Sequence, residues 1–92
     1  MSYKKLLMET KVSDAKILEI FIPYLTNKME FDDRKDNDIT LFTIIDTQEM
    51  SKDCLSTILK NMIDSKTITR PTIEYIINKY TQYNLNINEL YL

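Results

Sequence analysis

The chain of 92 residues contains no glycine. Glycine adopts left-handed backbone values more easily than any other residue, so each tight turn has to be built from residues for which those values cost free energy. A glycine-rich phosphate-binding loop is excluded as well. Histidine is also absent, which removes the most common general base and any imidazole metal ligand. We therefore expect no enzymatic activity, no cofactor and no metal site.

Apolar residues recur at the spacing of one helical face in three segments, residues 13–29, 51–63 and 70–83. No segment alternates with a period of two for long enough to predict a strand. The predicted fold is therefore all-α, a compact bundle of about five helices. Ninety-two residues form one domain, with residues 1–14 either part of it or an N-terminal extension.

Several residues mark where the predicted helices begin, bend or end. Ser51 is a good N-cap, Pro71 suits a first helical turn, and Asn86 can cap a short terminal helix. Pro23 removes one backbone donor and predicts a kink or break near Ile22. The buried stripe predicted after Ser51 consists of Leu55, Ile58, Leu59 and Met62.

Two charged or polar segments interrupt the helical pattern. Residues 30–38, EFDDRKDND, include seven charged residues out of nine and predict a solvated loop. Residues 64–69, DSKTIT, predict a second loop. Between them, residues 39–46 and 51–63 predict two helices that meet across a tight turn at residues 47–50.

This pair of helices resembles the helix-turn-helix of Cro and the phage repressors, the XRE-like family. Residues 40–51, TLFTIIDTQEMS, are similar to its first helix and turn, and residues 51–59, SKDCLSTIL, are similar to its recognition helix, with Leu55 and Ile58 facing inward. The motif covers about residues 40–62, and the whole resemblance covers about residues 38–92, with residues 15–29 as the first helix. Two residues depart from the family pattern: Glu49 replaces the usual turn glycine, and Ile45 replaces a small residue.

The resemblance implies a sequence-specific DNA-binding regulator, a repressor that binds double-stranded DNA as a homodimer. The second helix of the motif would enter the major groove with its first residues at the base edges. Residues off the Leu55 and Ile58 stripe would face the DNA, and hydroxyls at helix starts would meet phosphates. The predicted DNA-binding residues are Thr40, Ser51, Lys52, Asp53, Ser56, Thr57, Lys60, Lys66 and Arg70.

The charge balance leaves a second function open. Residues 52–79 carry five basic and three acidic side chains, yet the whole chain has a net charge of −2. An acidic chain is a weak match to a phosphate-driven binder. The alternative is a helix-turn-helix-like protein that binds and regulates another protein instead of DNA.

Self-association and location can also be predicted from the sequence. Apolar residues at the two ends of the chain are the predicted dimer contacts. A single cysteine, Cys54, excludes an internal disulfide and indicates a reducing cytoplasm. No apolar run reaches the length of a membrane span, so no membrane partner is expected. The predicted dimer contacts are Leu6, Leu7, Met8, Leu85, Leu90, Tyr91 and Leu92.

Overall fold

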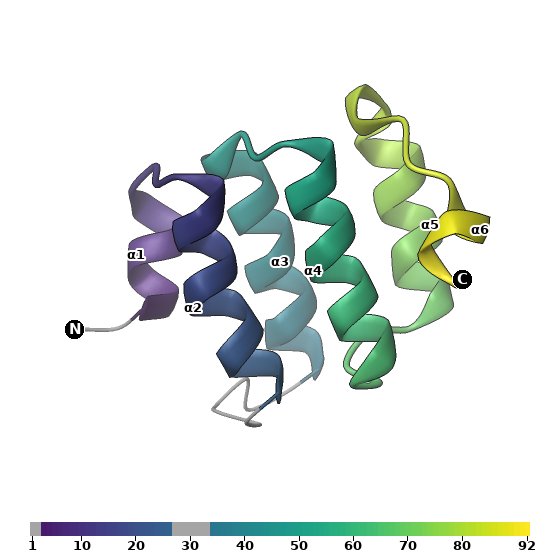
Figure 1. Cartoon of the computed structure of the whole chain (residues 1–92), viewed down its shortest axis with the longest axis horizontal. Helices are drawn as coiled ribbons and strands as arrows, with labels where there is room; N and C mark the ends of the chain where they lie inside the picture. The colour runs from purple at the N-terminus through teal and green to yellow at the C-terminus, as the bar shows by residue number, and fades with distance from the viewer. Residues whose placement is uncertain (1–2, 27–33) are drawn as a thin grey trace.

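The computed structural model describes residues 3–26 and 34–92, and within these residues the chain is all-α and has no strand (Figure 1). The all-α prediction is confirmed, with one helix more than expected. The elements are α1 (Tyr3–Glu9), α2 (Asp14–Thr26), α3 (Arg34–Gln48), α4 (Lys52–Asp64), α5 (Arg70–Lys79), the 3-10 helix η1 (Thr81–Tyr83) and α6 (Ile87–Leu90).

The first four helices form two helical hairpins that stack on each other. Helices α1 and α2 are joined by residues 10–13, and α3 and α4 are joined by residues 49–51. Helix α1 packs against α3, and α2 packs against α4. Figure 1 shows α2 and α4 side by side with α3 behind them, and α5 on the side of α4 that faces away from α2. Helix α4 therefore has neighbours on both flanks.

The core draws on every α-helix of the described chain. Leu7 of α1 is 2% exposed, and Leu55 and Ile58 of α4 are fully buried. Because Leu7 belongs to this core, α1 packs into the bundle. The predicted stripe of α4 is confirmed, and α5 buries Ile73 and Ile76, whereas its Ile77 is half-buried.

Two predicted boundaries differ from the structure. Helix α3 begins at Arg34, so residues 34–38 are helical where a loop was predicted; residues 30–33 lie outside the described part. A run of charged residues shows no apolar periodicity even when its backbone is helical. Helix α2 continues through Pro23 to Thr26, so of the predicted kink or break near Ile22 the break does not occur. Proline removes one donor, and one missing hydrogen bond near the end of a helix does not have to stop it.

Three residues with side chains take the left-handed backbone values that glycine favours. They are Glu49 with φ 48°, Lys66 with φ 58° and Asn84 with φ 50°. Each follows directly on a helical turn or a helix end, where a left-handed residue lets the chain reverse. The expected consequence of a glycine-free sequence, turns made by less suitable residues, is therefore visible at Glu49 and Lys66.

Replacing Lys66 with glycine is expected to raise the free energy of unfolding by about 0.5–1 kcal/mol, because the left-handed conformation then no longer forces a Cβ against the carbonyl. Lys66 is exposed, and two backbone hydrogen bonds close the turn that it forms. The Lys66 N–H donates to the Ile63 carbonyl at 3.1 Å, and the Thr67 N–H donates to the Met62 carbonyl at 2.9 Å. Lys66→Ala is the control, since alanine removes the charge and keeps the Cβ. Equal stabilisation by both variants in a denaturant titration would contradict this explanation.

Candidate functional site

Three local features between α3 and α4 agree with what the sequence predicted for these residues. Glu49 takes the left-handed position, Met50 is buried, and the Ser51 hydroxyl oxygen accepts a hydrogen bond from the Cys54 N–H at 3.1 Å. The predicted Ser51 cap is confirmed. The predicted burial of Leu55 and Ile58 is also confirmed, so the outward face of α4 is the one that the sequence indicated.

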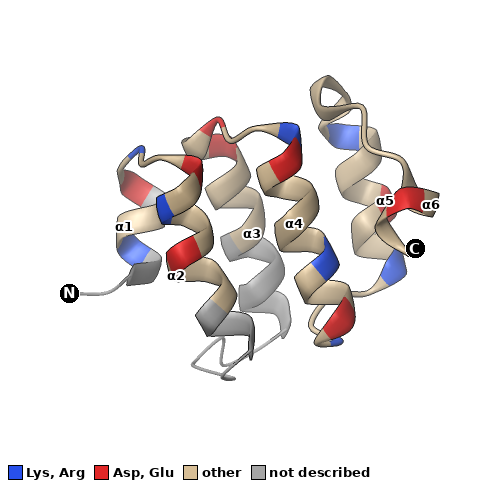
Figure 2. Cartoon of the chain, in the orientation of Figure 1, with Lys and Arg blue, Asp and Glu red and all other residues tan. Residues whose placement is uncertain are grey.

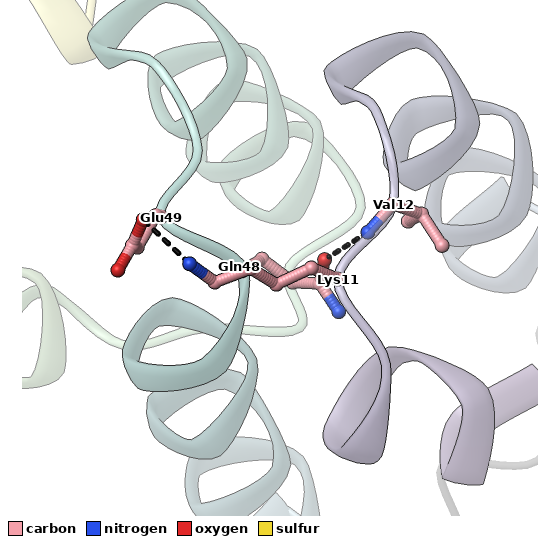
Figure 3. A network of polar contacts seen from close by, with 4 residues as sticks. All are labelled: Lys11, Val12, Gln48 and Glu49. Carbon is pink, nitrogen blue, oxygen red and sulfur yellow. Dashed lines mark hydrogen bonds and ion pairs between the residues drawn. The ribbon is translucent and has the colours of Figure 1, made fainter.

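The turn after α3 is held by the first hairpin. Gln48 is only 4% exposed, and its side-chain amide donates to the backbone carbonyls of Leu7 and Thr10, while its carbonyl oxygen accepts from Val12 N–H at 2.9 Å. Beside it, Lys11 forms an ion pair with Glu49 at 2.7 Å (Figure 3). The turn is thus part of the contact between the two hairpins. Gln48 was missed because a glutamine in a predicted turn gives no sign that it is buried.

Carboxylates surround the first turn of α4. The backbone N–H of Ser51 points at the Asp14 carboxylate, 3.4 Å from both oxygens. Asp53 follows Lys52 directly and Glu49 lies two residues before Ser51, and Figure 2 shows acidic residues at the start of α2, near the end of α3 and at the start of α4. A phosphate at this helix start would meet a carboxylate in the place where an anion gains most from backbone N–H groups.

The outward face of α4 holds some of the predicted DNA-binding residues and lacks others. Lys52, Asp53, Thr57 and Lys60 are exposed as predicted. Ser56 is half-buried, which corrects its predicted outward position; it follows the buried Leu55 directly and lies at the edge of the apolar stripe. The Thr57 hydroxyl donates to the Asp53 carbonyl at 2.8 Å, so part of its hydrogen-bonding capacity is used within the helix.

Charge on this face is balanced. Lys52 and Lys60 are offset by Asp53 and Asp64 of the same helix, and Figure 2 shows no basic stripe along α4. Non-specific DNA binding rests on several lysine or arginine contacts to phosphates. The charge of this face therefore gives weak support to DNA binding.

The other predicted residues lie away from the outward face of α4. Thr40 is inside α3 and not at a helix start as predicted, because α3 begins at Arg34; its side chain is outside the described part. Lys66 is in the link between α4 and α5. Arg70 begins α5, pairs with Glu74 at 3.2 Å and has its guanidinium 5.4 Å from the ring centre of Tyr91.

A cleft of about 610 Å³ lies between the start of α4, the outer face of α5 and the segment that leads into α6. It brings together Lys52 and Arg70 from the predicted set with three residues that were not predicted, Glu74, Asn78 and Glu89. Its volume is within the range of ordinary ligand sites. The one sequence feature that could have pointed to this cleft is the concentration of asparagine in residues 84–88, NLNIN.

The large apolar side chains that are exposed in the described chain are found in α5 and after α6. Tyr75 is 48% exposed, Tyr91 is 42% exposed and Leu92 is fully exposed. The Tyr75 ring lies 5.2 Å from that of Phe42, and the Lys79 ammonium lies 5.6 Å from its centre. We call the exposed side of α5 together with residues 84–92 the C-terminal surface.

Three buried ionisable groups have raised pKa values. Burial, with a smaller effect of the Asp14 charge, raises the pKa of the Cys54 thiol to about 11. Burial and then the 2.9 Å hydrogen bond to Asp46 raise the pKa of Tyr80, and burial raises the pKa of Tyr83. A thiol that stays protonated near neutral pH is a poor nucleophile. Cys54 is accordingly a packing residue, in agreement with its 3% exposure.

The chain matches no protein-family model, no curated protein and no solved structure in the comparisons made with each. Among the side chains that the structure describes, no group of three or more cysteine, aspartate or glutamate residues is placed to hold a metal ion. No described helix has both the length and the apolar character needed to cross a membrane.

Proposed function

We propose that the chain is a small helical domain that binds another protein through the C-terminal surface. One observation carries the proposal: α5 and residues 84–92 contain the exposed tyrosines Tyr75 and Tyr91 and all the lining residues of the 610 Å³ cleft except Lys52. Tyrosine is enriched at protein interfaces, because it adds a large contact area and a polar tip for little loss of side-chain entropy. This is the second of the two functions that the sequence left open.

The charges near Tyr75 and Tyr91 suit the same role. Arg70 lies over Tyr91, and Lys79 lies between Tyr75 and Tyr80, 5.5 Å from the Tyr80 ring centre. A cation held over an aromatic ring orders both side chains before a partner arrives. Less side-chain entropy is then lost on binding, which favours affinity.

Replacing Tyr75 with alanine is expected to reduce capture of the partner by about tenfold or more, as loss of a buried aromatic anchor does. The experiment compares the tagged chain, Tyr75→Ala and Thr57→Ala on nuclease-treated lysate of the source cells. Thr57 is the matched control, because it is exposed on α4 and outside the C-terminal surface. A protein retained equally by the parent chain and Tyr75→Ala, or lost only with Thr57→Ala, would contradict the proposal.

DNA binding is the second candidate, supported by the left-handed Glu49, the Ser51 cap and the burial of Leu55 and Ile58. Lys52 and Lys60 form no ion pair with a described residue and are free to meet phosphates. If this candidate is right, Lys52→Ala should lower by about one the slope of the logarithm of the DNA-binding constant against the logarithm of the salt concentration. Thr57→Ala should relax the sequence preference at one base position, with a loss of about 1–3 kcal/mol of binding free energy. A salt-titrated gel shift with random and genomic duplexes measures both, and no shift at low salt removes the candidate.

Homodimer formation stays a prediction, and fewer of the predicted contact residues are exposed to form an interface than the sequence suggested. Leu7, Leu85 and Leu90 were predicted dimer contacts but belong to the core of their own chain, since their side chains fill the spaces between helices. Tyr91 and Leu92 remain exposed, and the side chain of Met8 lies outside the described part. Sedimentation at micromolar concentration tests the dimer. A repressor role and a cytoplasmic location likewise remain proposals from the sequence.

A further inference from the structure

We propose that the cleft of the C-terminal surface binds an extended peptide segment of the partner, with an acidic residue against Lys52 and a basic residue against Glu89. The proposal rests on the proposed protein-binding function and assigns its site. It draws on three features of the cleft: free carboxamides, an apolar floor and unpaired charges of opposite sign.

The carboxamides of Asn78 and Asn84 are available to a ligand. Both residues are exposed and line the cleft, and neither side chain forms a hydrogen bond with any residue in the part of the chain that the structure describes. Asn86 differs, because its side-chain oxygen accepts from Asn88 N–H at 2.9 Å and caps α6. A carboxamide both donates and accepts. That is the pattern of an extended backbone, which presents N–H and C=O groups in alternation.

Three apolar residues also line the cleft, and together they are called its apolar floor. Leu85 is buried, and Ile77 and Ile87 are half-buried, so each presents at most part of its side chain to a ligand. An extended peptide places alternate side chains on opposite sides. One set would rest on this floor while the backbone meets Asn78 and Asn84.

The charges of the cleft decide the class of ligand. Arg70 and Glu74 neutralise each other in an ion pair, which leaves Lys52 and Glu89 as the charges without an ion-pair partner among the described residues. Lys52 and Arg70 balance Glu74 and Glu89, so the lining has no net charge and offers a nucleic acid or another polyanion no electrostatic attraction. A segment with one acidic and one basic residue matches both unpaired charges.

The test is selection of peptides from a displayed library of random twelve-residue sequences on the full chain, followed by affinity measurement of the synthetic peptides. Enriched peptides should share one acidic and one basic residue at a fixed spacing. The double variant Asn78→Ala, Asn84→Ala should bind them about tenfold more weakly, as expected for two lost hydrogen bonds. Lys52→Glu should select peptides in which the acidic residue is replaced by a basic one.

Lys60→Glu is the matched control, because it makes the same charge change on the outward face of α4, outside the cleft. The proposal is overturned if Lys60→Glu changes the selected peptides as Lys52→Glu does, if the double asparagine variant binds them with unchanged affinity, or if no peptide is enriched. Loss of the cellular partner with Tyr75→Ala, together with full capture by the double asparagine variant, would refute the peptide site and leave the protein-binding function standing.

Discussion

Replacing Ile58 with alanine is expected to lower the free energy of unfolding by about 2–5 kcal/mol, the usual range when a large core side chain is truncated. Ile58 is fully buried at the centre of α4, the helix that has α2 on one flank and α5 on the other. The substitution removes apolar contacts and leaves a cavity that the surrounding structure closes only in part. A small all-α domain has only about 5–15 kcal/mol of stability to lose.

Thr57→Ala is the control for Ile58→Ala, since Thr57 is the neighbouring residue and is exposed. It should change the stability by no more than about 0.5 kcal/mol, as is usual for surface positions. Chemical denaturation followed by circular dichroism at 222 nm, a wavelength that reports on helix, measures both variants. Similar losses in the two variants would show that α4 is not the buried centre of the bundle.

Replacing Gln48 with leucine is expected to cost about 3 kcal/mol, because the Leu7 and Thr10 carbonyls and the Val12 N–H all lose their side-chain partner and each buried unsatisfied group costs about 1–3 kcal/mol. The total is at the lower end of the sum of three such penalties, because water can reach the contacts that are only partly buried. The replacement keeps similar volume and is apolar, so the loss reports on the hydrogen bonds and not on a cavity.

Hydrogen exchange provides a second measurement for the same variant. The amide of Val12 should exchange faster in Gln48→Leu, because it no longer donates to the glutamine oxygen. Gln82→Leu is the control, since Gln82 is exposed on η1. An unchanged Val12 exchange rate and an unchanged stability would mean that Gln48 does not join the two hairpins.

Much of the fold follows from the sequence because burial leaves a periodic pattern. The stripe of Leu55, Ile58, Leu59 and Met62 repeats at helical spacing, and Ser51 has the side chain that an N-cap needs. Both features are local, so a single segment contains the whole signal. The same local reasoning identified Asn86 as the cap of α6, where it accepts from Asn88 N–H.

What the sequence did not show depends on contacts between distant segments. Gln48 meets residues 7–12 only after the two hairpins have stacked, and nothing near Gln48 indicates this. Asp14 similarly reaches Ser51 across 37 positions of the chain. The predicted DNA-binding surface assumed an open start of α4, whereas the structure places the Asp14 carboxylate there. The cleft also joins α4, α5 and α6 at positions far apart in sequence.

The most direct test of protein binding through the C-terminal surface is photocrosslinking from two single positions. A benzophenone amino acid is placed at position 75 in one sample and at position 57 in another, and both are irradiated in source-cell lysate. We predict a discrete protein adduct from position 75 and none from position 57, because Tyr75 lies on the proposed binding surface and Thr57 on the outward face of α4. Adducts to DNA or to protein from position 57, with none from position 75, would contradict the account.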